Sequence, residues 1–369
     1  LRKKRSAQDL RFKYYGFIAM CLALAVLVFL LYSIFSRGFS AFQKTTILLE
    51  INYDQDVLKL TPDSTDQEIE KGKFFKVKKN ALNNVFENLS KSDAKLIKKL
   101  FSTNIDKEIK NYYIDNPSVL NTTQKLWVTA HSNVDQMLKG NSRRDVPEDR
   151  RKLNDIQLSF IDQLVEEDRI QKEFNNFFFT RADSRHPEIA GIAGSFMGSL
   201  LTLFVVFILS FPIAIGASVY LEEFAPKNKL TELIEVNISN LAAVPSIVFG
   251  LLGLGVLLNV FGFPRSTPLV GGTVLALMTL PTIIIACRAS LKAVPPSIKE
   301  GALAIGATKS QAVFHHVVPL ALPGTLTGTI IGLAQALGET APLIMIGMVA
   351  FIPNIPTGIT EPSASLPVQ

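Results

Sequence analysis

The sequence predicts a mainly α, polytopic membrane protein with an inserted extramembrane domain of mixed α/β or helical structure, and three observations support this fold class. Hydrophobic residues make up 48% of the 369 residues and charged residues 19%. The mean hydropathy of +0.27 is higher than an ordinary soluble domain of this size has. Long apolar segments recur along the chain, and a polar stretch over residues 36–187 separates the first of them from the rest.

The first apolar segment, residues 14–35, predicts a transmembrane helix. As a helix it is about 33 Å long, enough to cross a bilayer core. The preceding tail, residues 1–13, is rich in lysine and arginine, so the positive-inside rule places the N-terminus in the cytoplasm. A cleaved signal peptide is the alternative, but the segment is long and no small-residue cleavage motif follows it.

Four further segments have the length and polarity of transmembrane helices: roughly residues 190–220, 239–262, 269–287 and 320–350. Five crossings that start in the cytoplasm place the lysine-bearing loops 221–238 and 288–319 on the cytoplasmic side as well. A net charge of +6 is typical of such loops, so we expect contact with the lipid bilayer and none with nucleic acid.

Residues 36–187 are predicted to form a periplasmic domain. The stretch TTILLEINYDQDVLKL is typical of a strand, while apolar residues at three- and four-residue spacing in two later stretches predict amphipathic helices. The many lysines here are compatible with this location, because long loops cross the membrane largely regardless of charge.

Catalytic and metal-binding signatures are absent from the sequence. It contains no phosphate-binding loop, no H-E-x-x-H and no C-x-x-C motif. His315 and His316 are adjacent and would point about 100° apart on a helix, so they do not form the usual metal-binding pair. We therefore expect no catalytic residue, no metal and no cofactor in this chain.

The stretch between the last two apolar segments, residues 288–319, is too long and too apolar for a passive turn. Pro295 and Pro296 suit the start of a helix, Gly306 suits a break, and Pro319 is expected to end a second helix. The apolar side chains of this pair favour docking into a groove of a cytoplasmic partner, with a helix lying on the bilayer surface as the alternative.

Residues 300–319 resemble the E-A-A…G…I-x-L-P loop of type I ABC importer permeases, with Gly301 in place of the first alanine. The stretches EEFAPKN and ALGETAPL further resemble the PstA family of phosphate permeases. This resemblance covers roughly residues 190–369. It implies a type I ABC importer permease fold for residues 188–369, with transmembrane helices 2–5, a coupling loop at about 288–319 and a sixth helix beyond Gln369. Residues 36–187 resemble an N-terminal extension found in part of the family.

The resemblance also implies a function and a set of partners. The chain would be a non-catalytic permease subunit of the bacterial inner membrane that imports inorganic phosphate. Its partners would be a PstC-type permease, a PstB-type ATPase dimer that binds ATP and Mg, and a PstS-type periplasmic phosphate-binding protein. The residues that would couple the chain to the ATPase are Glu300, Gly301, Ala302, Gly306 and Pro319. The alternatives are a permease for another oxyanion or a polyamine, and a membrane-anchored sensor.

Two charged residues at or inside apolar segments are predicted to lie on the translocation pathway. The guanidinium of Arg288 suits a bidentate phosphate contact, with a lipid-headgroup anchor as the alternative. Glu339 would repel phosphate and is expected to pair with an arginine. A separate series of small residues recurs every four positions and predicts a close helix contact: Gly324, Gly328, Gly332 and Ala336.

Overall fold

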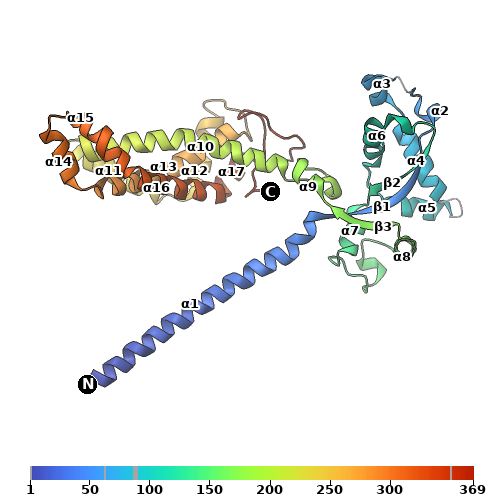
Figure 1. Ribbon diagram of the computed structural model, residues 1–369, viewed down its shortest axis with the longest axis horizontal. Helices are drawn as coiled ribbons and strands as arrows, with labels where there is room; N and C mark the ends of the chain where they lie inside the picture. The colour runs from blue at the N-terminus through green and yellow to red at the C-terminus, as the bar shows by residue number, and fades with distance from the viewer. Residues whose placement is uncertain (1, 62–63, 86–89, 350) are drawn as a thin grey trace. The chain divides into compact units, whose positions relative to one another are not determined.

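The computed structural model describes residues 2–61, 64–85, 90–349 and 351–369 and consists of two compact units (Figure 1). Unit 1 comprises Leu1–Phe178 and His186–Ile189, and unit 2 comprises Phe179–Arg185 and Ala190–Gln369. Each unit has its own hydrophobic core, so the two are described separately.

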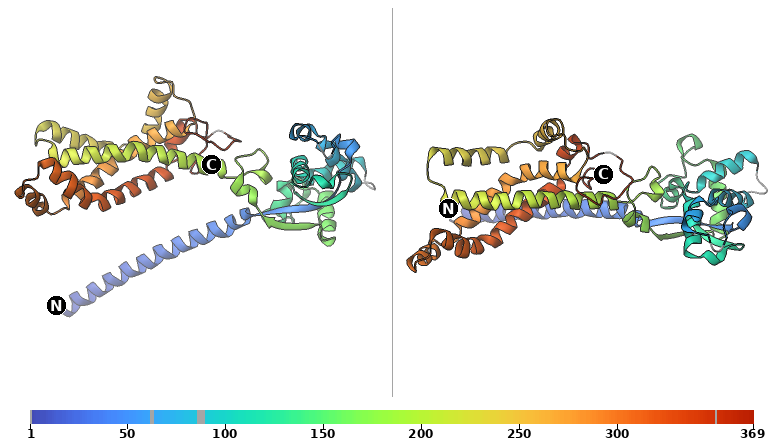
Figure 2. Two further views of the ribbon diagram at one scale, coloured as in Figure 1. Left: turned by 45° about the horizontal axis from the view of Figure 1, so that its top comes forward. Right: turned by 90° about the horizontal axis from the view of Figure 1, so that it is seen from above.

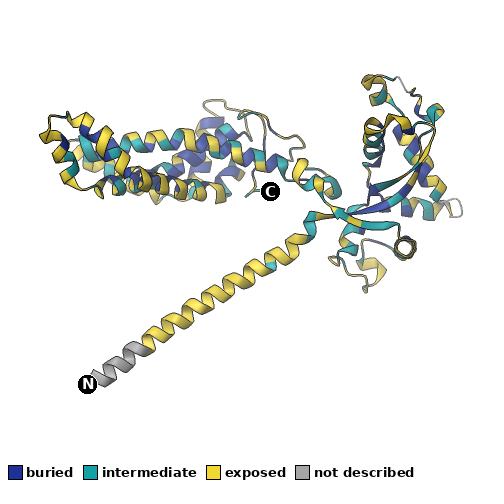
Figure 3. Cartoon of the chain, in the orientation of Figure 1, coloured by how far each residue is buried: buried dark blue, intermediate teal, exposed yellow. Residues whose placement is uncertain are grey.

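Unit 1 begins with α1 (Arg2–Gly38), a helix of 37 residues that a short 3-10 turn, η1 (Phe39–Phe42), extends. From Arg11 to Gly38 nearly every residue of this helix is exposed (Figure 3), and the exposed fractions of Leu24, Phe29 and Phe35 are each above one half. A helix that is apolar on every face and buried against no protein needs a lipid environment. The predicted first membrane span, residues 14–35, lies wholly within α1.

The rest of unit 1 is built on a three-stranded antiparallel sheet in the order β2-β1-β3. The strands are β1 (Gln43–Asn52), β2 (Thr123–Thr129) and β3 (Ile170–Phe174). The helices are α2 (Gln55–Leu58), α3 (Asp66–Lys71), α4 (Phe74–Val85), α5 (Lys91–Ile97), α6 (Ile105–Asp115), α7 (Ser132–Leu138) and α8 (Asp155–Glu166). Short 3-10 turns occupy Lys98–Leu100, Pro117–Val119, Glu148–Arg150 and Pro187–Ile189.

The core of unit 1 follows the two-residue period of β1. Ile47, Leu49 and Ile51 are fully buried on one face of this strand. They belong to one apolar cluster with residues of α4 and α6, whose spacing of three and four residues gives each helix one apolar side. The strand β1 ends earlier than the stretch TTILLEINYDQDVLKL predicts. Asp54 caps the short helix α2, so the extended backbone ends after Asn52.

Unit 2 is a helical bundle in which α13 (Pro268–Lys292) packs between α10 (Ala193–Val219) and α16 (Val318–Gly338) (Figure 2). The other α-helices are α9 (Asn176–Thr180), which crosses the boundary between the units, α11 (Lys229–Ala242), α12 (Ser246–Leu252), α14 (Pro296–Ala304), α15 (Lys309–Ala312) and α17 (Ala341–Met345). Three wider π-helical turns interrupt or extend these helices: η6 (Tyr220–Phe224), η7 (Gly253–Leu258) and η8 (Val313–Val317).

Four helices within the described ranges are long and apolar enough to cross a membrane: Arg11–Phe42, Ala193–Phe224, Pro268–Lys292 and Lys309–Gly338. A fifth crossing exists only if α11 and the helix Ser246–Leu258, which meet at 102°, count as one bent span. The membrane span expected at 239–262 is therefore not one continuous helix. Pro245 explains the break, because proline disfavours a helical conformation in the residue before it.

Two further expectations about helix ends are wrong. Pro319 does not end a helix, since the helical span continues from Lys309 to Gly338. The π turn η8 ends at Val317, two residues before Pro319, and this wider turn accommodates a residue that cannot donate the usual backbone hydrogen bond. Conversely, the apolar segment 320–350 is not one helix, because α16 stops at Gly338 and Pro342 lies in the first turn of the new helix α17.

Candidate functional site

The segment that the sequence singled out forms a helix, a tight turn and a second helix. Gly306 has a φ of +97°, a left-handed conformation that favours glycine. Its N–H donates to the carbonyl of Leu303 (3.0 Å), and the N–H of Ala307 donates to the carbonyl of Ala302 (3.1 Å). This pair of bonds is the Schellman motif, which ends α14. Thr308 then caps α15 through reciprocal hydrogen bonds with Gln311.

The turn presents one apolar surface outward and keeps another inside. Ile305 is 87% exposed and Leu303 is 42% exposed, while Glu300 and Gly301 are exposed beside them on α14. Ala302 of α14 is buried, as are Ala312 at the end of α15 and Val313 at the start of η8. Exposed large apolar residues at a sharp turn are typical of a docking surface.

Arg288 lies near the end of α13 and is only 16% exposed. Its Nη2 donates to Glu235 of α11 at 2.8 Å, and its Nε lies 3.4 Å from a carboxylate oxygen of Glu222 in η6. Lys292 adds a third cationic contact, 3.6 Å from Glu222. These side chains line an open cleft of about 740 Å³. In this chain the guanidinium thus holds two carboxylates.

Glu339 and Arg288 lie at opposite ends of the α13–α16 pair. Gly324 of α16 faces Ser290 of α13 and Gly332 faces Ile283, so the two helices run antiparallel. Arg288 is near the end of α13, whereas Glu339 follows the end of α16. Among the residues that the structure describes, Glu339 forms no ion pair, and its side chain is partly exposed.

The series of small residues on α16 faces α13. A Cβ atom on Gly324 or Gly328 would overlap Ser290 or Ala286, and one on Gly332 would lie 2.8 Å from the Cγ1 of Ile283. Ala336 is 1% exposed in the same bundle core. The absence of side chains at these positions allows the close approach of the two helices.

Sequence reasoning missed the acidic turn η6. Glu222 contacts Arg288 and Lys292, Glu223 pairs with Lys299 of α14, and the Phe224 ring stacks on Phe314. The available signal was a pair of acidic residues directly after a long apolar segment, in a loop expected on the same side of the membrane as the lysines of 288–319. By itself, the sequence does not identify which lysine each of these acids contacts.

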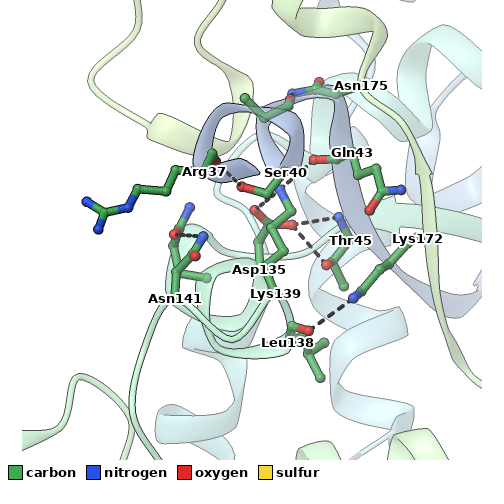
Figure 4. Close-up of polar contacts among 12 residues, drawn as sticks. Arg37, Ser40, Gln43, Thr45, Asp135, Leu138, Lys139, Asn141, Lys172 and Asn175 are labelled. Atoms are coloured by element: carbon green, nitrogen blue, oxygen red, sulfur yellow. Dashed lines mark hydrogen bonds and ion pairs between the residues drawn. The ribbon is translucent and has the colours of Figure 1, made fainter. Parts of the chain in front are cut away.

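A second polar cluster lies in unit 1, where β1 begins (Figure 4). Asp135 of α7 accepts hydrogen bonds from the N–H and the hydroxyl of Thr45, both at 2.9 Å. Lys139 donates to Asp135 (2.6 Å) and to the carbonyl of Gln43 (2.5 Å), and its side chain is 6% exposed. The carboxylate and ammonium satisfy each other and the strand backbone, so this cluster is a structural clamp.

Comparison with known families adds two findings. Residues 210–365 match the model of a family described as "Binding-protein-dependent transport system inner membrane component". Residues 2–148 match a model described as "Domain of unknown function (DUF3333)". The match over 210–365 and the described apolar helices confirm the predicted fold class, a mainly α, polytopic membrane protein.

Several curated proteins resemble the C-terminal half of the chain. The "Probable ABC transporter permease protein YqgI" of Bacillus subtilis is 31% identical over 45% of this chain and 56% of its own length. "Phosphate transport system permease protein PstC" of Haemophilus influenzae is 32% identical over 46% of this chain and 61% of its own length. "Probable phosphate transport system permease protein PstA" of Methanocaldococcus jannaschii is 30% identical over 48% of this chain and 62% of its own length. The matches span roughly three fifths of these relatives.

One solved structure, titled as inward-facing conformations of the MetNI methionine ABC transporter, aligns with 38% of this chain and 68% of its own. The identity is 22% and the TM-score 0.34.

Proposed function

We propose that this chain is the PstA-type permease subunit of an ATP-driven importer that carries inorganic phosphate across the bacterial inner membrane. The observation that carries the proposal is the α14–Gly306–α15 turn with its exposed Leu303 and Ile305, inside the residues that match the transport family. Relatives named as phosphate permeases at 30–32% identity favour phosphate over another oxyanion or a polyamine.

In this proposal the N-terminus and the turn around Gly306 are cytoplasmic, and the folded part of unit 1 is periplasmic. A second permease of the PstC type completes the pathway, and a PstS-type binding protein delivers phosphate. Two PstB-type ATPase subunits bind ATP and Mg, and their closure displaces α14. The chain itself performs no hydrolysis. Its rigid helices pass the displacement on to the pathway.

The test of this proposal is a pair of substitutions at Gly306. Gly306→Val places a β-branched side chain at a φ of +97°, so the turn must change shape. Gly306→Asn is the matched control, because asparagine tolerates the left-handed region. We expect Val to reduce radiolabelled phosphate uptake at limiting concentration by about tenfold and Asn to keep most of it.

Co-purification of the ATPase is measured in the same cells. Normal uptake by the Val variant would contradict the coupling role of the turn. Absence of phosphate uptake and of a bound ATPase in the unsubstituted full-length protein would favour the sensor alternative.

A further inference from the structure

We propose that the π turn η6 holds the turn around Gly306 on the end of α10. The turn has two arms: α14 is the first, and α15 with η8 is the second. Glu223 and Phe224 of η6 are the positioning residues. This inference rests on the proposed function, because it assigns to η6 the transfer of motion from α14 and α15 to the membrane helices. It is carried by three neighbouring residues of one turn that each contact a different element of unit 2.

Glu223 holds the first arm. Its carboxylate accepts a hydrogen bond from the Nζ atom of Lys299 in α14. The Glu223 side chain is 10% exposed and that of Lys299 is 31% exposed, so water screens this ion pair less than it screens a surface pair. Of the nine described residues of α14, only Ala302 is buried. Apolar packing therefore secures α14 weakly, and the ion pair is its main polar attachment.

Phe224 holds the second arm. Its ring stacks on Phe314 of η8, with ring centroids 6.4 Å apart and an interplanar angle of 27°. The Nζ of Lys309 in α15 lies 5.2 Å from the centroid of the Phe224 ring, a cation–π contact. Adjacent residues of η6 thus contact the helix before Gly306 and the helix after it.

Glu222 connects the same turn to α13 through Arg288 and Lys292. The N–H of Ala225 donates to the carbonyl of Tyr220 at 2.7 Å, a bond over five residues that defines the π turn. In this wider turn, Glu222, Glu223 and Phe224 contact α13, α14 and η8, respectively. Because all three contacts meet on η6, a displacement of α14 moves the ends of α10 and α13 with it.

The experiment uses the full-length protein reconstituted with its permease, ATPase and phosphate-binding partners. Glu223→Gln and Lys299→Gln each remove one charge of the pair, and the reversed pair Glu223→Lys with Lys299→Glu restores the attraction. We expect each single variant to lower the phosphate moved per ATP hydrolysed by about tenfold, while ATPase co-purification stays unchanged. The reversed pair should recover most of this ratio, which a merely destabilising change would not do.

Matched controls are Glu232→Gln and Lys229→Gln, which remove the same charges at exposed positions of α11. A second comparison sets Phe224→Ala against Phe224→Trp, since tryptophan keeps an aromatic face for Phe314 and Lys309. Single variants that transport at the unsubstituted ratio would overturn the proposal. So would a reversed pair that assembles but transports no better than the single variants.

The contact itself is tested without phosphate or ATP. In a chain that carries Cys21→Ser and Cys287→Ser, the pair Phe224→Cys and Phe314→Cys should be joined by a short bifunctional thiol reagent in membranes. Failure of this cross-link overturns the contact between η6 and η8 whatever the cargo is. If the cross-link forms but the unsubstituted complex moves no phosphate, the proposed function fails and the contact stands.

Discussion

At the scale of single residues, Arg288 shows how a neighbouring side chain changes the meaning of a charge. An arginine at the end of an apolar helix is suited to bind phosphate, yet here its guanidinium contacts Glu222 and Glu235. Removing it would leave two partly buried carboxylates without the guanidinium that they share, which is unfavourable. Loss of function on substitution is therefore expected from either role, and a single variant does not separate them.

A triple variant separates the two roles of Arg288. Arg288→Gln alone should abolish phosphate uptake and leave membrane insertion intact. If its role is to hold the two acids, the combination Arg288→Gln, Glu222→Gln and Glu235→Gln should restore uptake, because no unpaired carboxylate remains and the Lys292 ammonium is largely exposed to solvent. If Arg288 contacts phosphate, the triple variant stays inactive. The measurement is phosphate uptake per amount of inserted protein. Uptake by Arg288→Gln near the unsubstituted level would contradict both roles.

Tyr53 gives unit 1 a pH dependence of known sign. The residue is fully buried, its hydroxyl donates to the carbonyl of Ile109 at 3.1 Å, and burial followed by the neighbouring Tyr112 raises the pKa of Tyr53 well above its usual value. In the unfolded chain the Tyr53 hydroxyl ionises near pH 10, whereas in the folded protein it stays neutral at that pH. The stabilisation is therefore complete below pH 10 and decreases above it, by up to about 1.4 kcal/mol per pH unit.

The measurement is urea unfolding of the full-length protein between pH 8 and about 11, followed by the fluorescence of Trp127, the single tryptophan of the chain, which lies in β2. Tyr53→Phe should lose about 1 kcal/mol at neutral pH and show a smaller alkaline decrease. Identical alkaline profiles for the two proteins would contradict this assignment.

At the scale of elements, the contact of α13 and α16 depends on the lack of side chains along one face. Gly328→Ala should destabilise the bundle, because its Cβ would overlap the Cβ of Ala286. Adding Ala286→Gly should restore the lost thermal stability by reopening the space. Gly216→Ala on α10 is the control, since a Cβ there meets nothing within 4 Å in this chain. Thermal unfolding in detergent checks this, and equal melting temperatures for all variants would argue against close packing.

Local chemistry predicts some elements well and others poorly. The central parts of α10 and α13 are predictable from the length of their apolar segments. The break at Gly306 is predictable because glycine adopts a positive φ without strain. The continuation through Pro319 depends on a π turn, and the end of α16 at Gly338 falls inside the segment 320–350, which the sequence predicts as one membrane span. The Glu223–Lys299 pair joins residues 76 positions apart, and no periodicity in sequence identifies such a partner.

At the scale of the whole molecule, the sheet domain of unit 1, residues 43–174, connects to the rest of the chain through two neighbouring strands. Gln43, the first residue of β1, pairs with Phe174, the last residue of β3. Residues 43–174 can therefore be replaced by a short flexible linker without stretching the chain. We expect this deletion to preserve membrane insertion and ATPase co-purification. Loss of both in an otherwise stable protein would show that unit 1 is needed to assemble the permease.

The same arrangement determines how the sheet domain of unit 1 bears mechanical load. Tension that separates its two chain connections pulls β1 from β3 at one end, where the backbone hydrogen bonds would open one after another like a zipper. That end is reinforced: Lys139 bonds to the carbonyl of Gln43, and the backbone and side-chain amides of Asn175 donate to Phe42 (2.8 Å) and Ala41 (3.1 Å). Because these bonds must break before the first strand pair opens, the force needed to unravel unit 1 is set at this seam.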